Sequence, residues 1–216
     1  MNSLDVSKLF DVEHTLLKEL FVNCDDIYEI IPKINEYCKE IAKKLGNEYY
    51  EISPDVFAPK DAVISEKATV IGPAIIGHKT EVRPGAYIRG SVIIGDGAVI
   101  GNSTEIKNSI IFDEVQLPHY NYVGDSILGF RAHLGAGAII SNFRLDHKNI
   151  TVKCKDKKIE TGLRKMGALI GDFCEIGCNS VICPGSILGR NTVIYPLSTV
   201  NGVTNFNYAE ESESNK

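Results

Sequence analysis

The chain has 216 residues, of which 44% are hydrophobic, and a formal net charge of −5. This length allows one main core, and the acidic balance argues against nucleic-acid partners, which require a basic face. No apolar run is long enough for a signal peptide or a membrane span, so we expect a cytoplasmic protein that binds neither nucleic acid nor membrane.

Residues 1–50 have the spacing of helices. Their apolar residues recur at intervals of three and four, which is the pattern of a helix with one buried face. They include Ile27, Ile30, Ile31, Ile34, Cys38, Ile41 and Leu45. We expect an N-terminal helical segment that caps the open end of the domain after it. The alternative is a helix that binds a partner.

Residues 51–207 repeat with a period of six. An aliphatic residue returns at every sixth position, and a small residue stands four places later. One block of this series runs through Ile76, Val82, Ile88, Ile94, Ile100 and Ile106. The period fits short strands joined by turns, three to a coil, rather than helices or the irregular turns of a β-sandwich. It predicts an all-β solenoid over 51–207, in which each coil covers the next.

Three segments depart from this period. At about 143–166, the alternating Ile150, Val152 and Cys154 precede a polar turn, which predicts an inserted β-hairpin. Earlier, the count of six fails at LPHYNY, residues 117–122. We interpret this failure as a loop that carries His119 and Tyr122 off the wall of the solenoid, because functional residues concentrate on loops. Residues 208–216 are expected to form a flexible tail.

The six cysteines do not form a recognisable framework. Their spacing is irregular, with no paired C-x-x-C, and we expect no export to an oxidising compartment. They are Cys24, Cys38, Cys154, Cys174, Cys178 and Cys183. We therefore expect reduced thiols that pack as small residues, and no metal site.

The hexapeptide repeat resembles that of the left-handed parallel β-helix acyltransferases. Within it, EIK (105–107), PHYNYVGD (118–125), LGAG (134–137) and SN (141–142) resemble the acetyltransferase half of the bifunctional enzymes that make UDP-N-acetylglucosamine from glucosamine-1-phosphate. The likeness runs from about Arg83 to Gly171. Residues 1–50 contain no Gly-rich phosphate loop, so we expect no nucleotidyltransferase activity.

The resemblance implies a set of site residues. His119 corresponds to the family's general base. The sugar phosphate would contact Arg83 or Arg89, Lys107, Tyr122, His133, Asn142 and Lys165. The R-P-G-A context favours Arg83, whereas a spacing of 18 residues before Lys107 favours Arg89. His133 stands where the amino-sugar enzymes have Asn. Acetyl-CoA would lie against Ala136, Cys178, Asn179, Ser180 and Pro196.

These residues suit acyl transfer. A histidine can take a proton at neutral pH, and backbone N–H groups around Ala136 could support an oxyanion. The resemblance thus implies an acetyl-CoA-dependent N-acetyltransferase acting on an amino-sugar phosphate or a nucleotide-linked amino sugar. Two alternatives remain: an O-acetyltransferase acting on a sugar or small alcohol, and a non-catalytic solenoid that binds a sugar phosphate or scaffolds a partner.

The resemblance also implies a homotrimer with sites shared between subunits. A single prism has nearly flat walls, and closed symmetric oligomers are common for such surfaces. We expect Tyr120, Tyr122 and residues 110–112 to lie at the subunit interface.

Overall fold

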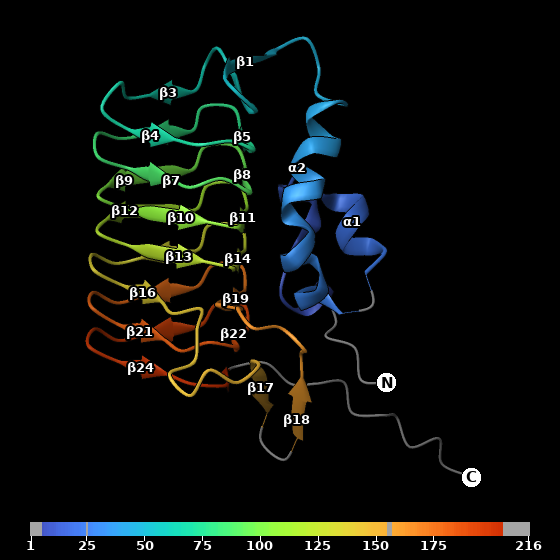
Figure 1. Ribbon diagram of the computed structural model, residues 1–216. Coiled ribbons are helices and arrows are strands. Elements are labelled where there is room, and N and C mark those ends of the chain that lie inside the picture. Colours follow the sequence, from blue (N-terminus) through green and yellow to red (C-terminus); the bar gives the residue numbers. More distant parts are fainter. Residues whose placement is uncertain (1–5, 25, 155–156, 205–216) are drawn as a thin grey trace.

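The computed structural model describes residues 6–24, 26–154 and 157–204. It confirms the predicted left-handed parallel β-helix, a prism with three walls (Figure 1). Sheet A contains β1 (Tyr49–Ser53), β2 (Val56–Pro59), β5 (Ala74–Ile76), β8 (Val92–Ile94), β11 (Ser109–Ile111), β14 (Ile127–Leu128), β19 (Ala168–Ile170), β22 (Ser186–Leu188) and β25 (Val203–Thr204).

The other two walls are built in the same way. Sheet B contains β3 (Val63–Ile64), β6 (Glu81–Val82), β9 (Val99–Asn102), β12 (Gln116–His119), β15 (His133–Leu134), β20 (Glu175–Ile176) and β23 (Val193–Ile194). Sheet C contains β4 (Thr69–Val70), β7 (Tyr87–Ile88), β10 (Glu105–Lys107), β13 (Tyr122–Gly124), β16 (Ile139–Ile140), β21 (Val181–Ile182) and β24 (Thr199–Val200). Most strands of sheets B and C contribute one buried aliphatic residue to the inside of the prism, as the period of six predicts.

The predicted break at residues 118–122 is wrong. Leu117 and Val123 are both fully buried, and they continue the inward series of sheets B and C. The period instead loses one residue earlier: Ile111 pairs with Ile94, 17 positions before it, although Ile106 pairs with Ile88, 18 positions before it. The missing residue therefore belongs to the corner at Asn108, between sheets C and A.

His119 and Tyr122 consequently do not lie on a projecting loop. His119 is the last residue of β12, and Tyr122 is the first residue of β13. Only a two-residue corner separates them, in which Tyr120 has a φ of 53°. The count of six failed here because it carried forward an offset that arose at Asn108.

The N-terminal helical segment does not cap the end of the prism, contrary to expectation. It contains η1 (Val6–Lys8), η2 (Val12–His14), α1 (Lys18–Val22), η3 (Ile27–Lys33) and α2 (Ile34–Ala42). These helices lie along sheet A, with α2 in contact with β5 and β8 (Figure 1). The outward residues of this wall are apolar, for example Ile75 and Ile93, and they are almost fully buried.

Phe112 joins the helical segment to the wall. Its ring centroid lies 5.2 Å from that of Phe10 and 5.2 Å from that of Phe21. Ile110, Ile111 and Phe112 are each 0% exposed within this single chain. The prediction that residues 110–112 lie at a subunit interface is therefore wrong, because the chain's own helices cover sheet A there.

A hairpin made of β17 (Thr151–Cys154) and β18 (Lys157–Glu160) lies near the last coils. Ile150 and Val152 are fully buried, and β17 contacts β22 and β25 of sheet A. Sheet A is thus covered by the helices and then by the hairpin. The tail at 208–216 lies outside the described residues. No helix in the described part of the chain combines the length and apolar character needed to cross a membrane.

Candidate functional site

Sheet C presents cationic side chains where its strands end. Ile88 pairs with Ile106, and Lys107 pairs with Gly124. Arg89 follows Ile88, so Arg89, Lys107 and Gly124 occupy the same position in three successive coils, each about 4.8 Å from the next. Side chains alternate along a strand. Because Ile88 and Ile106 point inward, Arg89 and Lys107 point outward.

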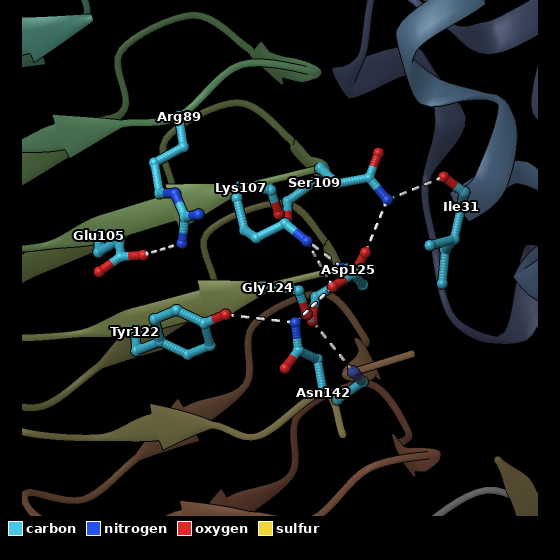
Figure 2. Close-up of polar contacts among 12 residues, drawn as sticks. Ile31, Arg89, Glu105, Lys107, Ser109, Tyr122, Gly124, Asp125 and Asn142 are labelled. Carbon is cyan, nitrogen blue, oxygen red and sulfur yellow. Dashed lines mark hydrogen bonds and ion pairs between the residues drawn. The ribbon is translucent and has the colours of Figure 1, made fainter. Parts of the chain in front are cut away.

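Arg89 and Lys107 border a cavity of about 350 Å³. It is lined by Arg89, Lys107, Tyr122, Asn142, Phe143 and Lys165. In Figure 2 the side chains of Lys107, Tyr122 and Asn142 meet near the end of β13, and that of Arg89 points toward Glu105. Three of the six lining residues are cationic, so the cavity is suited to an anion.

Gly124 lies beside two residues that line this cavity, Tyr122 and Asn142. A Cβ atom at this position would lie 2.6 Å from Asn142 Nδ2 and 2.7 Å from Tyr122 Oη. The backbone of Gly124 does not adopt a positive φ, so its conformation is open to other residues. A side chain at this position would therefore displace the polar ends of Tyr122 and Asn142, and glycine is common where groups approach a strand closely.

Asp125 anchors a polar network beside the cavity (Figure 2). Its side chain is 6% exposed, and its Oδ2 atom lies 3.3 Å from Lys107 Nζ. Asn142 Nδ2 also donates to Oδ2, and Asn108 Nδ2 donates to Oδ1 at 2.8 Å. Asn108 Nδ2 donates in addition to the carbonyl of Ile31, at 3.1 Å. The network thus joins the cavity to the N-terminal helical segment.

The two candidate arginines lie on different walls. Arg89 borders the cavity, and its Nη1 donates to Glu105 Oε1 at 2.7 Å. Arg83 follows β6 on sheet B, where its Nη2 lies 2.9 Å from Glu81 Oε2. Arg83 is absent from the residues that line the cavity.

Tyr122 keeps its proton. Burial raises the pKa of its hydroxyl, although a hydrogen bond from Asn142 opposes this shift. In that bond Asn142 Nδ2 donates to Tyr122 Oη at 3.2 Å. The phenol is therefore a neutral group that can both accept and donate.

His119 lies in a second group of predicted residues, at the corner between sheets B and C. The N–H of Gly137 donates to the His119 carbonyl, and that of Asn179 donates to the Ala136 carbonyl. The coil-to-coil register therefore stacks His119, Ala136, Cys178 and Pro196. His119 is exposed and does not line the cavity. Apart from Tyr122, the sheet C residues that line the cavity, Arg89, Lys107 and Asn142, lie at or just beyond the other end of the strands.

The remaining predicted residues lie on or beside sheet B. His133 Nδ1 lies 2.8 Å from Glu175 Oε2, outside the residues that line the cavity. Asn179 is an exposed corner residue with a φ of 55°. Ser180 is buried, and its hydroxyl donates to the carbonyl of Tyr195 at 3.0 Å, so its side chain packs in the wall.

Family comparisons agree with this architecture. A family model described as the GMPPB C-terminal domain matches residues 70–164. A second, described as bacterial transferase hexapeptide (six repeats), matches residues 167–202. The chain belongs to the hexapeptide-repeat transferases.

The relatives of this chain include proteins that are longer than it. A bifunctional sugar-1-phosphate nucleotidylyltransferase/acetyltransferase from Sulfurisphaera tokodaii is 38% identical over 162 residues, which cover 74% of this chain and 40% of that protein. The bifunctional protein GlmU of Methanococcus aeolicus is 39% identical, in a match that covers 90% of this chain and 54% of that protein. The chain thus spans about half the length of the curated relatives it matches.

Solved structures that match this chain have lower sequence identity to it than these relatives do. The acetyltransferase domain of PglB from Neisseria gonorrhoeae FA1090, in complex with acetyl coenzyme A, is 16% identical, with a TM-score of 0.33. That match covers 80% of this chain and 63% of the PglB chain.

The sequence alone did not indicate several residues of the cavity or of the polar network beside it. Asn108, Asp125 and Gly124 were not singled out, nor was Phe143, which lines the cavity. A signal was available: Asn108, Asp125 and Asn142 recur at intervals of 17 residues. This interval is one short of three hexads, and it is the length of the shortened coils.

The described residues of this transferase offer no metal centre. They include no cluster of three or more His, Cys, Asp or Glu side chains that could hold an ion. Cys38, Cys174, Cys178 and Cys183 are free thiols. Burial raises the pKa of Cys38 to about 12 and that of Cys174 to about 11, so these two thiols are protonated and unreactive at neutral pH.

Proposed function

We propose that the chain is an acetyltransferase that moves the acetyl group of acetyl-CoA to the amine of an amino-sugar phosphate or a nucleotide-linked amino sugar. The observation that carries the proposal is the convergence of Arg89, Lys107 and Lys165 on one cavity of about 350 Å³. The printed name of the S. tokodaii relative pairs a sugar 1-phosphate with an acetyltransferase, which supports the same substrate class.

The phosphate would bind to the cationic side of the cavity. Arg89 can form two parallel hydrogen bonds with phosphate oxygens, and Lys107 and Lys165 add charge. Arg89 would exchange Glu105 for the phosphate, because an exposed ion pair of this kind is weak. The hydroxyl of Tyr122 would add a neutral donor.

His119 would act as the general base. The amine nitrogen attacks the thioester carbonyl carbon, and the imidazole takes a proton from that nitrogen as the C–N bond forms. The C–S bond then breaks, and the coenzyme A sulfur leaves with the proton returned to it. Backbone N–H groups of the turn around Ala136 would stabilise the oxyanion. No covalent enzyme intermediate is needed.

A second copy of the chain would complete the site. Within one chain, His119 does not line the cavity, so we propose a homotrimer in which His119 of one subunit faces the cavity of a neighbour. Sheets B and C and their corner carry exposed apolar side chains that such packing would cover. These include Tyr120, Val193, Tyr195 and Leu197, which are 62%, 59%, 78% and 80% exposed.

Release of free thiol from acetyl-CoA tests the proposal. The protein is incubated with acetyl-CoA and with glucosamine-1-phosphate, nucleotide-linked amino sugars, neutral sugars or small alcohols. We expect thiol release with an amino sugar that carries phosphate. Release with alcohols alone would indicate an O-acetyltransferase. If none of the acceptors gives thiol release, while calorimetry still shows binding of a sugar phosphate, the chain would be a non-catalytic binding protein.

A further inference from the structure

We propose that Asp125 is a positioning residue that sets which way the polar groups of the cavity face. Asp125 fixes the orientation of the Asn142 amide. In that orientation the Tyr122 hydroxyl can donate its hydrogen to the bound anion. The carbonyl oxygen of Asn142 can accept a hydrogen bond from a neighbouring hydroxyl or amine of the substrate. This inference rests on the proposed function, because it concerns the same cavity.

The carboxylate determines the orientation of Asn142. Asp125 is nearly buried and forms an ion pair with Lys107, and an ionised carboxylate can only accept hydrogen bonds. The atom of Asn142 that contacts Asp125 Oδ2 must therefore be the NH2 nitrogen, as Figure 2 shows. An amide without such a partner could rotate by half a turn and exchange its donor and acceptor.

The same NH2 group determines the role of Tyr122. An amide nitrogen carries two hydrogens. One is donated to Asp125, and the other is donated to Tyr122 Oη at 3.2 Å. Because the phenol oxygen accepts from Asn142, its own hydrogen is left for a ligand. The raised pKa of Tyr122 keeps that hydrogen in place at neutral pH.

The helical segment secures the other side of the network. Asn108 Nδ2 donates both to Asp125 Oδ1 and to the carbonyl of Ile31. Rotation of the Asn108 amide would place its oxygen against the Ile31 carbonyl, which can only accept. Asn108 therefore keeps its NH2 group toward Asp125. The orientation of the whole network follows from two fixed acceptors, the Asp125 carboxylate and the Ile31 carbonyl.

The resulting cavity has a definite polarity. Arg89, Lys107 and Tyr122 all offer donors, whereas Asn142, whose amide nitrogen is held by Asp125 and Tyr122, has its oxygen left to accept. Such a surface matches an anion that carries a hydroxyl or amine close by, as in a hexosamine phosphate. Gly124 makes this possible, because a Cβ there would separate Tyr122 from Asn142.

The variant Asp125→Asn separates this role from simple charge. The φ of Asp125 is 51°, a conformation that Asn adopts as readily as Asp, so the fold should be retained. Asn108 requires an acceptor at the Oδ1 position, so the new NH2 would face Lys107 and Asn142. The Asn142 amide would then turn its oxygen toward Tyr122 and take up the hydroxyl hydrogen.

The two possible roles of Asp125, as a negative charge and as a positioning residue, predict opposite changes in anion affinity for Asp125→Asn. Loss of a negative charge beside the cavity would by itself strengthen the binding of an anion. Loss of the fixed orientation would weaken it, and we expect binding of glucosamine-1-phosphate, measured by calorimetry without acetyl-CoA, to weaken about tenfold, the usual cost of one lost hydrogen bond to a charged group. Unchanged or tighter binding by Asp125→Asn would overturn the inference.

A double-mutant cycle with Tyr122→Phe completes the test. We expect Tyr122→Phe to weaken binding about tenfold in the natural chain and to have little further effect in the Asp125→Asn background, because the hydroxyl hydrogen is already withdrawn there. Additive effects would overturn the inference. Should Asp125→Asn fail to fold, unchanged binding by Tyr122→Phe alone would also overturn it. A natural chain that binds no sugar phosphate would instead reject the proposed function, and this inference with it.

Discussion

Arg89 and Lys107 occupy the same outward position in successive coils of sheet C. The N–H of Arg89 donates at 2.8 Å to the carbonyl of Ile106, the residue before Lys107. Both cations border the same cavity, so the wall itself sets their spacing. A pair of cations held one strand apart suits the phosphate site that we propose.

This relationship predicts that Arg89→Ala raises KM for the sugar phosphate at least tenfold. The bidentate hydrogen bonds that an arginine forms with phosphate would be lost. The matched control is Arg83→Ala, which removes the same side chain from sheet B, where it pairs with Glu81. Equal and small effects of both substitutions on KM would show that the phosphate binds elsewhere.

His119→Ala should lower kcat about 100-fold, the usual contribution of a general base. The free energy of unfolding should be nearly unchanged, because the side chain is exposed. His78→Ala serves as the control, since His78 pairs with Asp61 in a different coil. Near-full turnover by His119→Ala would remove His119 from the mechanism.

Phe112→Ala should destabilise the fold by about 3–5 kcal/mol. Its ring is fully buried between Phe10 and Phe21 and the prism, so truncation leaves a cavity between the helical segment and sheet A. Urea denaturation measures the effect. Leu145→Ala, at a side chain that is 96% exposed, is the control and should change stability by less than about 0.5 kcal/mol.

The raised pKa of Asp113 predicts that the free energy of unfolding depends on pH. Burial, together with the nearby Asp96, raises the pKa of its carboxyl, despite the hydrogen bond it accepts from the Asp96 N–H. The folded state then disfavours ionisation, so the contribution of Asp113 to stability is fully present below the ordinary Asp pKa of about 3.9 and is lost as pH rises through the raised value.

The variant Asp113→Asn isolates this contribution, because it cannot ionise. Relative to this variant, the natural chain should lose free energy of unfolding as the pH is raised through that window. Urea titrations of both proteins at a series of pH values measure the difference. A difference that is constant with pH, or that changes in the opposite direction, would contradict the prediction.

Light scattering should give a mass of about 71 kDa, three times the 23.7 kDa of the chain. Tyr195→Glu together with Leu197→Glu should lower that mass, since both exposed side chains would then carry charge into the contact. A mass near that of the single chain at micromolar concentration would reject the shared site.

Part of the cavity could be predicted from spacing alone. Eighteen residues separate Arg89 from Lys107, and three hexads return the chain to the same face of the prism. The choice of Arg89 over Arg83 follows from that arithmetic wherever the coils are regular. The network around Asp125 could not be predicted in this way, because the corner at Asn108 shortens the coil by one residue and the count of six conceals it.

The sequence by itself determined the prism. Its coils are stabilised by hydrogen bonds between neighbouring strands and by one buried aliphatic residue in most strands of sheets B and C, such as Ile88, Ile106 and Val123, and both features repeat locally enough to be read from the period. Only the tertiary structure decided where the helical segment lies and how the cavity is polarised. Both depend on contacts distant in sequence, such as Asn108 with Ile31 and Phe112 with Phe10, whose geometry no local spacing specifies.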